Sequence, residues 1–210
     1  MNADSKSDAA PRLRDRLKEA TRSAILDAAE TVFARDGVQG ARMEDVAGSA
    51  GVAVGTLYNY FEDRHALLEA LLEARRAELL ACIDAALEPA DLPFESTLQA
   101  MLTVIFDYYR QHLGLFALHM EAELVLRARG SYAASAMQAV FERMVRLVEA
   151  GVAGGALRAK DADLYPPVLM GMLRGVFMRH IRGIGAPPDP DSAVRLARIF
   201  LHGAAREVSR

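Results

Sequence analysis

Residues 43–61, MEDVAGSAGVAVGTLYNYF, constrain the fold more than any other part of this chain. Ala47 stands where two helices must approach closely. Gly51, four residues later, stands where a tight turn favours a residue that tolerates positive φ. The apolar residues expected on the inward faces of the two short helices are Val46, Ala50, Val52 and Leu57. The pattern predicts a helix-turn-helix, which places its second helix in the major groove of DNA.

The outward face of the second helix holds small, polar and aromatic groups that can reach base edges or phosphate oxygens. The residues predicted to contact DNA from this face are Val54, Gly55, Thr56, Tyr58, Asn59 and Tyr60. Two core helices joined by a glycine turn would show the same spacing, so the flanking sequence matters. Upstream, apolar residues recur at helical spacing between Thr21, the expected N-cap, and Gly37, the expected stop. A third helix is therefore predicted before the pair.

With this third helix, the chain resembles the N-terminal domain of the TetR (AcrR-like) family of one-component transcriptional regulators, from Thr21 to about Leu68. The matching residues are Ile25-Leu26-Ala28-Ala29-Phe33-Gly37, Val46-Ala47-Ala50-Gly51-Val52, Gly55-Thr56-Leu57-Tyr58-Asn59-Tyr60-Phe61 and Leu67. The resemblance implies an all-α protein of nine helices. A flexible basic arm (1–20) would precede a three-helix DNA-binding domain (21–66), and a larger helical effector-binding and dimerisation domain (67–210) would follow.

Three positions depart from the family pattern. Ala53 stands where a serine or threonine usually caps the recognition helix, and its lack of a hydroxyl costs about 1 kcal/mol. Arg42 replaces the threonine that usually opens the second helix, and Arg64 replaces a lysine. Both arginines are predicted to contact phosphate, because a guanidinium binds phosphate as well as an ammonium does.

Bulk charge does not favour nucleic acid, since 25 Lys and Arg face 28 Asp and Glu. The N-terminal residues are locally basic, with Arg12, Arg14, Arg16, Lys18 and Arg22. This arm is either a solvated tail or a DNA-contacting element. The single cysteine, Cys82, excludes an internal disulfide, and neither a signal peptide nor a membrane span is predicted. A cytoplasmic protein is expected.

Beyond Phe61 the sequence predicts long helices. Their expected ranges are 63–87, 93–112, 115–129, 131–152, 162–182 and 191–207. The glycines at 151, 154 and 155 predict a helix-ending turn and not a phosphate loop, because no strand precedes them and no Gly-Lys-Ser/Thr follows.

An aromatic and methionine-rich set lies where the family resemblance implies an effector pocket. Its members are Met101, Ile105, Phe106, Tyr109, His112, Phe116, His119, Met120, Met137, Phe141 and Met144. Ordinary core packing is the alternative interpretation. As a pocket, the set predicts an apolar or aromatic effector. His112 and His119, with Glu121 and Glu123, lack metal-site spacing, so neither a metal nor a cofactor is predicted.

Small residues at helical spacing near the C-terminus allow two helices to approach closely. The candidate dimer seam comprises Gly171, Met172, Gly175, Ala193, Leu196, Ala197, Phe200 and Ala204. A contact within one chain would produce the same pattern. The family resemblance implies that this helix pair forms a four-helix bundle across a two-fold axis, so that two recognition helices read a palindromic operator.

The sequence thus predicts a ligand-responsive transcriptional regulator, most simply a repressor that a small hydrophobic or aromatic effector releases from DNA. A helical dimeric interaction module with a degenerate DNA-binding head is an alternative, favoured by the absent hydroxyl caps at Arg42 and Ala53. An enzyme acting on a small molecule is a weaker alternative, because the sequence shows no assembled nucleophile, acid/base pair or cofactor loop.

Overall fold

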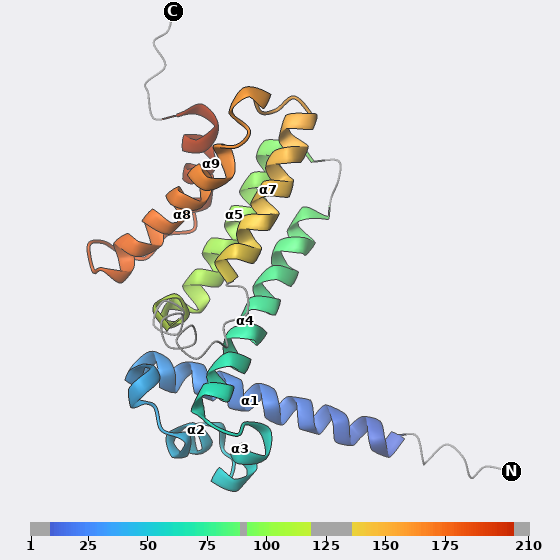
Figure 1. Ribbon diagram of the computed structural model, residues 1–210, viewed down its shortest axis with the longest axis vertical. Coiled ribbons are helices and arrows are strands. Elements are labelled where there is room, and N and C mark those ends of the chain that lie inside the picture. The colour runs from blue at the N-terminus through green and yellow to red at the C-terminus, as the bar shows by residue number, and fades with distance from the viewer. Residues whose placement is uncertain (1–8, 89–91, 119–135, 204–210) are drawn as a thin grey trace, which may run out of the picture. The chain divides into compact units, whose positions relative to one another are not determined.

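The computed structural model describes residues 9–88, 92–118 and 136–203, which are helical throughout their regular elements and contain no strand (Figure 1). The helices in chain order are α1 (Ala9–Gly40), α2 (Met43–Ala50), α3 (Val54–Tyr60), α4 (Arg64–Leu87), α5 (Phe94–Gln111), α7 (Ala136–Ala153), the 3₁₀ turn η1 (Ala159–Asp161), α8 (Tyr165–Ile181) and α9 (Ser192–His202). Residues 113–118 are also helical. The predicted all-α class is confirmed. No helix within the described ranges is long and apolar enough to cross a membrane.

Two compact units divide the chain. Unit 1 includes residues up to Ala74 together with the segment that begins at Gly114, and unit 2 includes Arg75–Leu113 and the C-terminal helices. Helix α4 therefore contributes its first turns to unit 1 and the remainder to unit 2. The sequence predicted an arm that ends at residue 20 and two domains that meet at residue 66. Those boundaries were assigned by function and not by packing, so they stay a prediction.

The core of unit 1 forms where α1, α2 and α3 meet. Ile25 and Ala29 of α1, Ala47 of α2 and Leu57 of α3 are completely buried, and α2 packs against both of its neighbours. The helical segment 113–118 also lies against α1, because a Cβ on Gly114 would come within 2.6 Å of the Ala34 Cβ. Close packing of these buried apolar side chains thus fixes the three helices that form the predicted DNA-binding head.

Helix α1 corrects one prediction and confirms another. It begins at Ala9, so Thr21 is not its N-cap; the Thr21 hydroxyl instead donates to the Leu17 carbonyl at 2.9 Å, inside the helix. The helix continues through the basic arm because residues 12–20 contain good helix formers and no glycine or proline. Gly37, the predicted stop, has φ 72° and ψ 171° and does interrupt the helix.

Helix α4 has a side-chain cap at its start. Asp63 Oδ1 accepts hydrogen bonds from the backbone amides of His65 and Ala66, each at 2.8 Å. These are two of the N–H groups that a helix start leaves without a backbone partner. The predicted range of 63–87 is therefore correct to within one residue.

We expect Asp63→Ala to lower the free energy of unfolding by about 1 kcal/mol, because the two amides lose their acceptor. Chemical denaturation measures the change. Asp63→Asn is the matched variant, since an asparagine side-chain oxygen can also cap the helix. It should keep most of the stability that Asp63→Ala loses. Equal destabilisation by both variants would show that the cap geometry is not the cause.

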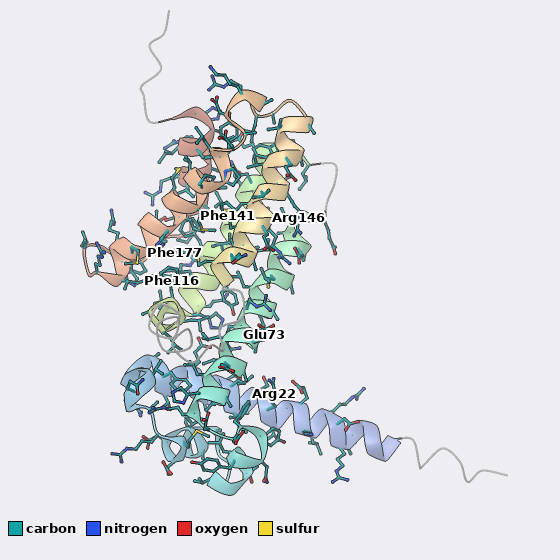
Figure 2. The ribbon with its side chains drawn as sticks, in the orientation of Figure 1. Arg22, Glu73, Phe116, Phe141, Arg146 and Phe177 are labelled. Carbon is teal, nitrogen blue, oxygen red and sulfur yellow. The ribbon has the colours of Figure 1, made fainter. Side chains whose placement is uncertain are left out.

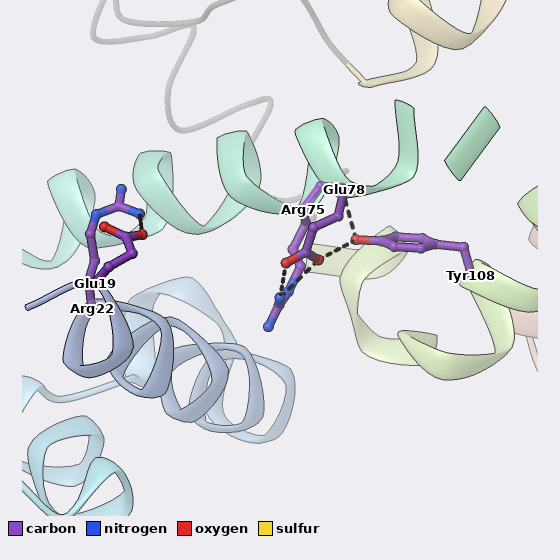
Figure 3. A network of polar contacts seen from close by, with 5 residues as sticks. All are labelled: Glu19, Arg22, Arg75, Glu78 and Tyr108. Atoms are coloured by element: carbon purple, nitrogen blue, oxygen red, sulfur yellow. Dashed lines mark hydrogen bonds and ion pairs between the residues drawn. The ribbon is translucent and has the colours of Figure 1, made fainter. Parts of the chain in front are cut away.

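Unit 2 is held together by pairs of long helices. α5 packs against α9, and α7 packs against α8. A polar network also joins α4 to α5 (Figure 3): the buried Arg75 pairs with Glu78 at 3.0 Å, and the Tyr108 hydroxyl donates to the Arg75 carbonyl at 2.8 Å. The bonds hold the unit 2 part of α4 in register with α5.

The C-terminal helices lie close to their predicted ranges. α8 begins at Tyr165 and not at Ala162, because Ala159–Asp161 forms the 3₁₀ turn η1. The predicted glycine turn after α7 is present: the amides of Ala156 and Leu157 both donate to the Gly151 carbonyl, at 2.8 and 3.1 Å. Parts of the predicted helices at 115–129, 131–152 and 191–207 fall outside the described residues.

Candidate functional site

The turn between α2 and α3 has the geometry expected of a helix-turn-helix. Gly51 adopts a left-handed conformation with φ 68° and ψ 28°. The Val52 amide donates to the Ala47 carbonyl at 3.0 Å and so closes the end of α2. Helix α3 then starts after Ala53 with its apolar side chain Leu57 fully buried. The positive φ predicted for Gly51 is observed.

Gly51→Ala should destabilise the protein by roughly 1 to 2 kcal/mol, because a Cβ is strained in the left-handed region. Gly55→Ala is the matched control: Gly55 lies in α3 with negative φ, and no atom lies within 4 Å of the position that its Cβ would occupy. Alanine is the better helix former, so this control should gain about 0.5 to 1 kcal/mol. Thermal or chemical unfolding of both variants measures the difference, and a stabilising Gly51→Ala would contradict the geometry.

The predicted recognition face of α3 points away from the core of unit 1. Val54 and Tyr58 are 37% and 47% exposed, and Gly55 and Asn59 are also exposed, whereas Thr56 and Tyr60 are half-buried at the edge of this face. A DNA duplex could therefore reach these six residues without rearrangement of the core. Their contacts with bases and phosphates stay a prediction.

Both recognition-unit helices start without a side-chain cap. Neither Arg42 at α2 nor Ala53 at α3 makes a capping hydrogen bond. Glu44 and Asp45 lie in the first turn of α2, where negative charge stabilises the helix dipole. Arg42 itself is exposed, as a phosphate contact requires. The start of α3 is held by packing and by backbone bonds from Thr56 and Leu57 to the Ala53 carbonyl.

Arg64 has contacts that the sequence did not predict. Its Nη1 donates to the carbonyls of Gln39 at 2.6 Å and Ala41 at 3.3 Å, and its Nη2 lies 3.2 Å from the Gln39 side-chain oxygen. The guanidinium therefore ties the first residue of α4 to the end of α1. No local sequence signal links positions 25 residues apart, so only the fold could reveal this role. The predicted phosphate contact stays untested.

A groove of about 470 Å³ lies between the N-terminal part of α1 and the recognition helix. Its lining residues are Asp15, Lys18, Glu19, Arg22, Asn59 and Tyr60. Arg22 lies over the Phe61 ring, 5.8 Å from its centroid, and 3.9 Å from Glu19 (Figure 3). The basic arm is thus helical from Ala9 and places two cations beside two residues predicted to bind DNA, with two carboxylates among them.

Comparison with known proteins agrees with this geometry. The family model for bacterial regulatory proteins of the tetR family matches residues 25–71. The HTH-type transcriptional repressor KstR2 of Rhodococcus jostii is 26% identical over 149 residues, which cover 70% of this chain and 72% of that protein. The uncharacterized HTH-type transcriptional regulator YhgD of Bacillus subtilis is also 26% identical, over 70% of this chain and 76% of its own length.

The fold is shared as well. The structure of the transcriptional regulator FadR from Bacillus subtilis in complex with stearoyl-CoA superposes with a TM-score of 0.71, at 15% identity, over 87% of this chain and 99% of that one. The fatty acid degradation regulator FadR from Bacillus halodurans gives a TM-score of 0.72 at 20% identity, over 87% and 99%. The helix-turn-helix region of this chain, residues 25–71, belongs to the TetR family. The chain is similar over most of its length to HTH-type transcriptional regulators, with an N-terminal helix-turn-helix and a helical C-terminal region.

The predicted effector residues differ in their burial, and their role as a pocket stays a prediction. Met101, Ile105, Phe106, Tyr109 and Met144 are buried in unit 2, and burial raises the pKa of Tyr109. Phe177 of α8, labelled in Figure 2, contacts this cluster: its ring stacks on that of Tyr109, with 3.9 Å between centroids, and meets the Phe106 ring edge-on at 5.4 Å. The half-buried members are His112, Phe116, Met137 and Phe141. His119 and Met120 lie outside the described residues.

Two cavities of unit 2 lie outside the buried cluster around Phe106 and Tyr109. One, of about 500 Å³, is lined by Phe141 and its neighbours on α7 and by the start of α8. The other, of about 710 Å³, lies where α4 ends, α5 begins and α7 ends, and none of the predicted pocket residues lines it. Sequence reasoning missed this second cavity, although the small residues Ala150, Gly151 and Gly154, at the end of α7 and in the turn after it, were a usable signal.

Of the histidine and glutamate residues weighed as metal ligands, only His112 belongs to the described part of the chain; His119, Glu121 and Glu123 lie outside it. His112 lies against the Tyr108 ring, with 4.4 Å between ring centroids. The described ranges contain no cluster of three possible metal ligands.

The residues of the predicted dimer seam fall into two groups. Ala193, Leu196 and Ala197 are buried, and α9 packs against α5 of the same chain, so the contact within one chain accounts for them. Gly171 and Gly175 of α8 are exposed, with open space where a Cβ would lie. Met172 and Phe200 are half-buried, and Ala204 lies outside the described residues. The TetR-family dimer seam on α8 and α9 stays a prediction.

Proposed function

We propose that this regulator is a homodimeric repressor that binds a palindromic operator in the cytoplasm and is released by a small apolar or aromatic effector. The observation that supports DNA reading most is the exposed face of α3, which presents Tyr58 and Asn59 beside the left-handed turn at Gly51. Two such helices about 34 Å apart read successive major grooves of a palindrome. KstR2 is named a repressor, which supports the same output here.

The exposed α8 face supports the proposed dimer. Val168 is 49% exposed, and Gly171 and Gly175 follow it on the same helix at spacings of three and four residues. Glycines without neighbours let a second helix approach closely. A second copy packed on this face would bury an apolar surface that one chain leaves in water.

Effector control requires differential affinity for the DNA-bound and DNA-free states. An effect of about 1 to 3 kcal/mol is the usual scale of such coupling. The complex of the Bacillus subtilis FadR with stearoyl-CoA indicates that this fold can bind a ligand with a long acyl chain. Here α4 is shared by the two units, and the chain passes between them again at Leu113–Gly114, so both are covalent connections through which a change in unit 2 can reach the head. An effector that binds free and operator-bound dimer equally would contradict this mechanism.

Selection of bound sequences from random duplex DNA, at near-physiological salt, tests the proposed function. We expect an enriched palindrome that binds two chains, as measured by analytical ultracentrifugation of the complex. No enrichment by a folded dimer would favour the second candidate, a helical interaction module whose head has lost DNA affinity. The uncapped starts of α2 and α3 at Arg42 and Ala53 are the observation that supports this alternative.

A further inference from the structure

A groove in unit 2 has the size and lining of a small-molecule site. Its volume is about 710 Å³, within the range of about 300 to 1,000 Å³ typical of ligand pockets. It opens where the last turn of α4, the start of α5 and the last turns of α7 meet. Leu87, Leu92 and Leu147 give it an apolar lining, while Asp84 and Arg146 lie at its polar edge.

The wall formed by α7 is made of small residues. Phe94 packs directly on this wall, because a Cβ at Gly151 would come within 2.5 Å of its ring. Ala150 of α7 and Gly154, in the turn after α7, also line the groove and present no long side chain to it. The groove is therefore open because of residue choice on α7, and a larger side chain at Ala150 would fill it.

The charges at the polar edge leave one cation in excess. Asp84 accepts two hydrogen bonds from Arg143, at 2.8 Å from Nε and 2.6 Å from Nη2. Arg143 thereby lowers the pKa of Asp84, which stays ionised and neutralised by its partner at neutral pH. Arg146 lies one turn further along α7 and has no hydrogen-bonded carboxylate among the residues that the structure describes; it exerts only a longer-range attraction on Asp84. Figure 2 shows Arg146 on α7.

We propose that this groove binds an amphipathic monoanion, with its anionic head at Arg146 and its apolar body along Leu87, Leu92 and Leu147. An oxyanion satisfies the excess positive charge and accepts charge-assisted hydrogen bonds from the guanidinium. An alkyl chain removes the leucine side chains from water. The inference rests on the proposed function only in naming this ligand as an effector; it places the ligand at the ends of α4, α5 and α7 and not among the buried aromatic residues of α5.

Isothermal titration of the full-length protein with decanoate, below its critical micelle concentration and without DNA, tests the proposal. The neutral probe 1-decanol has the same chain length. We expect decanoate to bind once per chain and Arg146→Gln to weaken its binding by roughly ten-fold, because a hydrogen bond to a charged group is lost. Binding of 1-decanol should not change in this variant, and Arg146→Lys should restore part of the decanoate affinity.

Two further variants separate the groove from general apolar adsorption. Ala150→Phe fills the groove and should abolish binding of both probes, while Arg182→Gln, at an exposed arginine outside the groove, should leave both unchanged. Circular dichroism and denaturation confirm that each variant is folded. Wild-type affinity for decanoate in Arg146→Gln or in Ala150→Phe would overturn the proposal, as would the absence of decanoate binding to the folded wild type.

Because these titrations contain no DNA, failure to bind either probe leaves the proposed operator binding standing. Conversely, probe binding without selection of any DNA sequence would support the ligand site in the groove and contradict the proposed repressor function.

Discussion

Phe106→Ala is expected to lower the free energy of unfolding by about 3 to 5 kcal/mol, the range for removing a buried aromatic side chain. Phe106 is 1% exposed, and its ring meets Phe177 edge-on with 5.4 Å between centroids. The substitution leaves a cavity between α5 and α8 and also removes a partner of the Tyr109–Phe177 stack. Urea denaturation followed by circular dichroism measures the loss.

The size of this loss distinguishes core from ligand pocket. Phe141→Ala is the matched control, because Phe141 is half-buried and already lines a cavity at the start of α8. Phe141→Ala should lower the free energy of unfolding by about 1 to 2 kcal/mol, since the Phe141 side chain buries less apolar surface than that of Phe106. If Phe106→Ala costs no more than Phe141→Ala, the α5 cluster is not close-packed, and the pocket interpretation of Phe106 and Tyr109 gains support.

Arg64→Ala should destabilise the protein by about 1.5 to 3 kcal/mol, because charge-assisted hydrogen bonds to the end of α1 are lost. The Gln39 carbonyl, at 2.6 Å, and the partly buried Ala41 carbonyl, at 3.3 Å, would lose a donor. Arg64→Lys keeps the charge but cannot reproduce the two-sided contact with both Gln39 and Ala41. It should therefore recover less than half of the lost stability. Full recovery by lysine would show that charge alone, and not the fork geometry, holds α4 to α1.

The same two variants test the predicted phosphate contact. A single phosphate contact contributes about 1 to the slope of the logarithm of affinity against the logarithm of salt concentration. Arg64→Ala should reduce this slope by about 1 if the guanidinium reaches DNA, and Arg64→Lys should preserve it. An unchanged slope in Arg64→Ala, with lowered stability, would assign Arg64 to the structure of unit 1 alone.

The helix-turn-helix was predictable because its constraints are local. The turn requires a residue that tolerates positive φ, which is Gly51, and the helix contact requires a small side chain, which is Ala47. A short window of sequence specifies both. The interruption of α1 at Gly37 and the cap of α4 at Asp63 follow from similarly local signals. Local signals failed for Thr21, because its hydroxyl bonds within a helix as readily as it caps one.

Features that depend on distant contacts were not predictable. The bonds of Arg64 to Gln39 and Ala41 join positions that are far apart in the chain. The groove between α4, α5 and α7 likewise depends on how three helix ends meet. For the α9 residues such as Leu196, the sequence pattern left dimer contact and core contact open, and burial against α5 accounts for them within one chain. The periodicity reports that a face is apolar but not what covers it.

Helix α3 is proposed to read DNA bases as one half of a dimer, and the function of the whole chain depends on this step. Parallel selection from random duplex DNA with the wild type and Asn59→Ala tests it most directly, because Asn59 is exposed on α3 and its amide can recognise a base edge. We predict an enriched palindrome for the wild type, and for Asn59→Ala a changed base preference at one pair of symmetric positions. Absence of a palindrome, or the same base preferences in both proteins, would contradict this account.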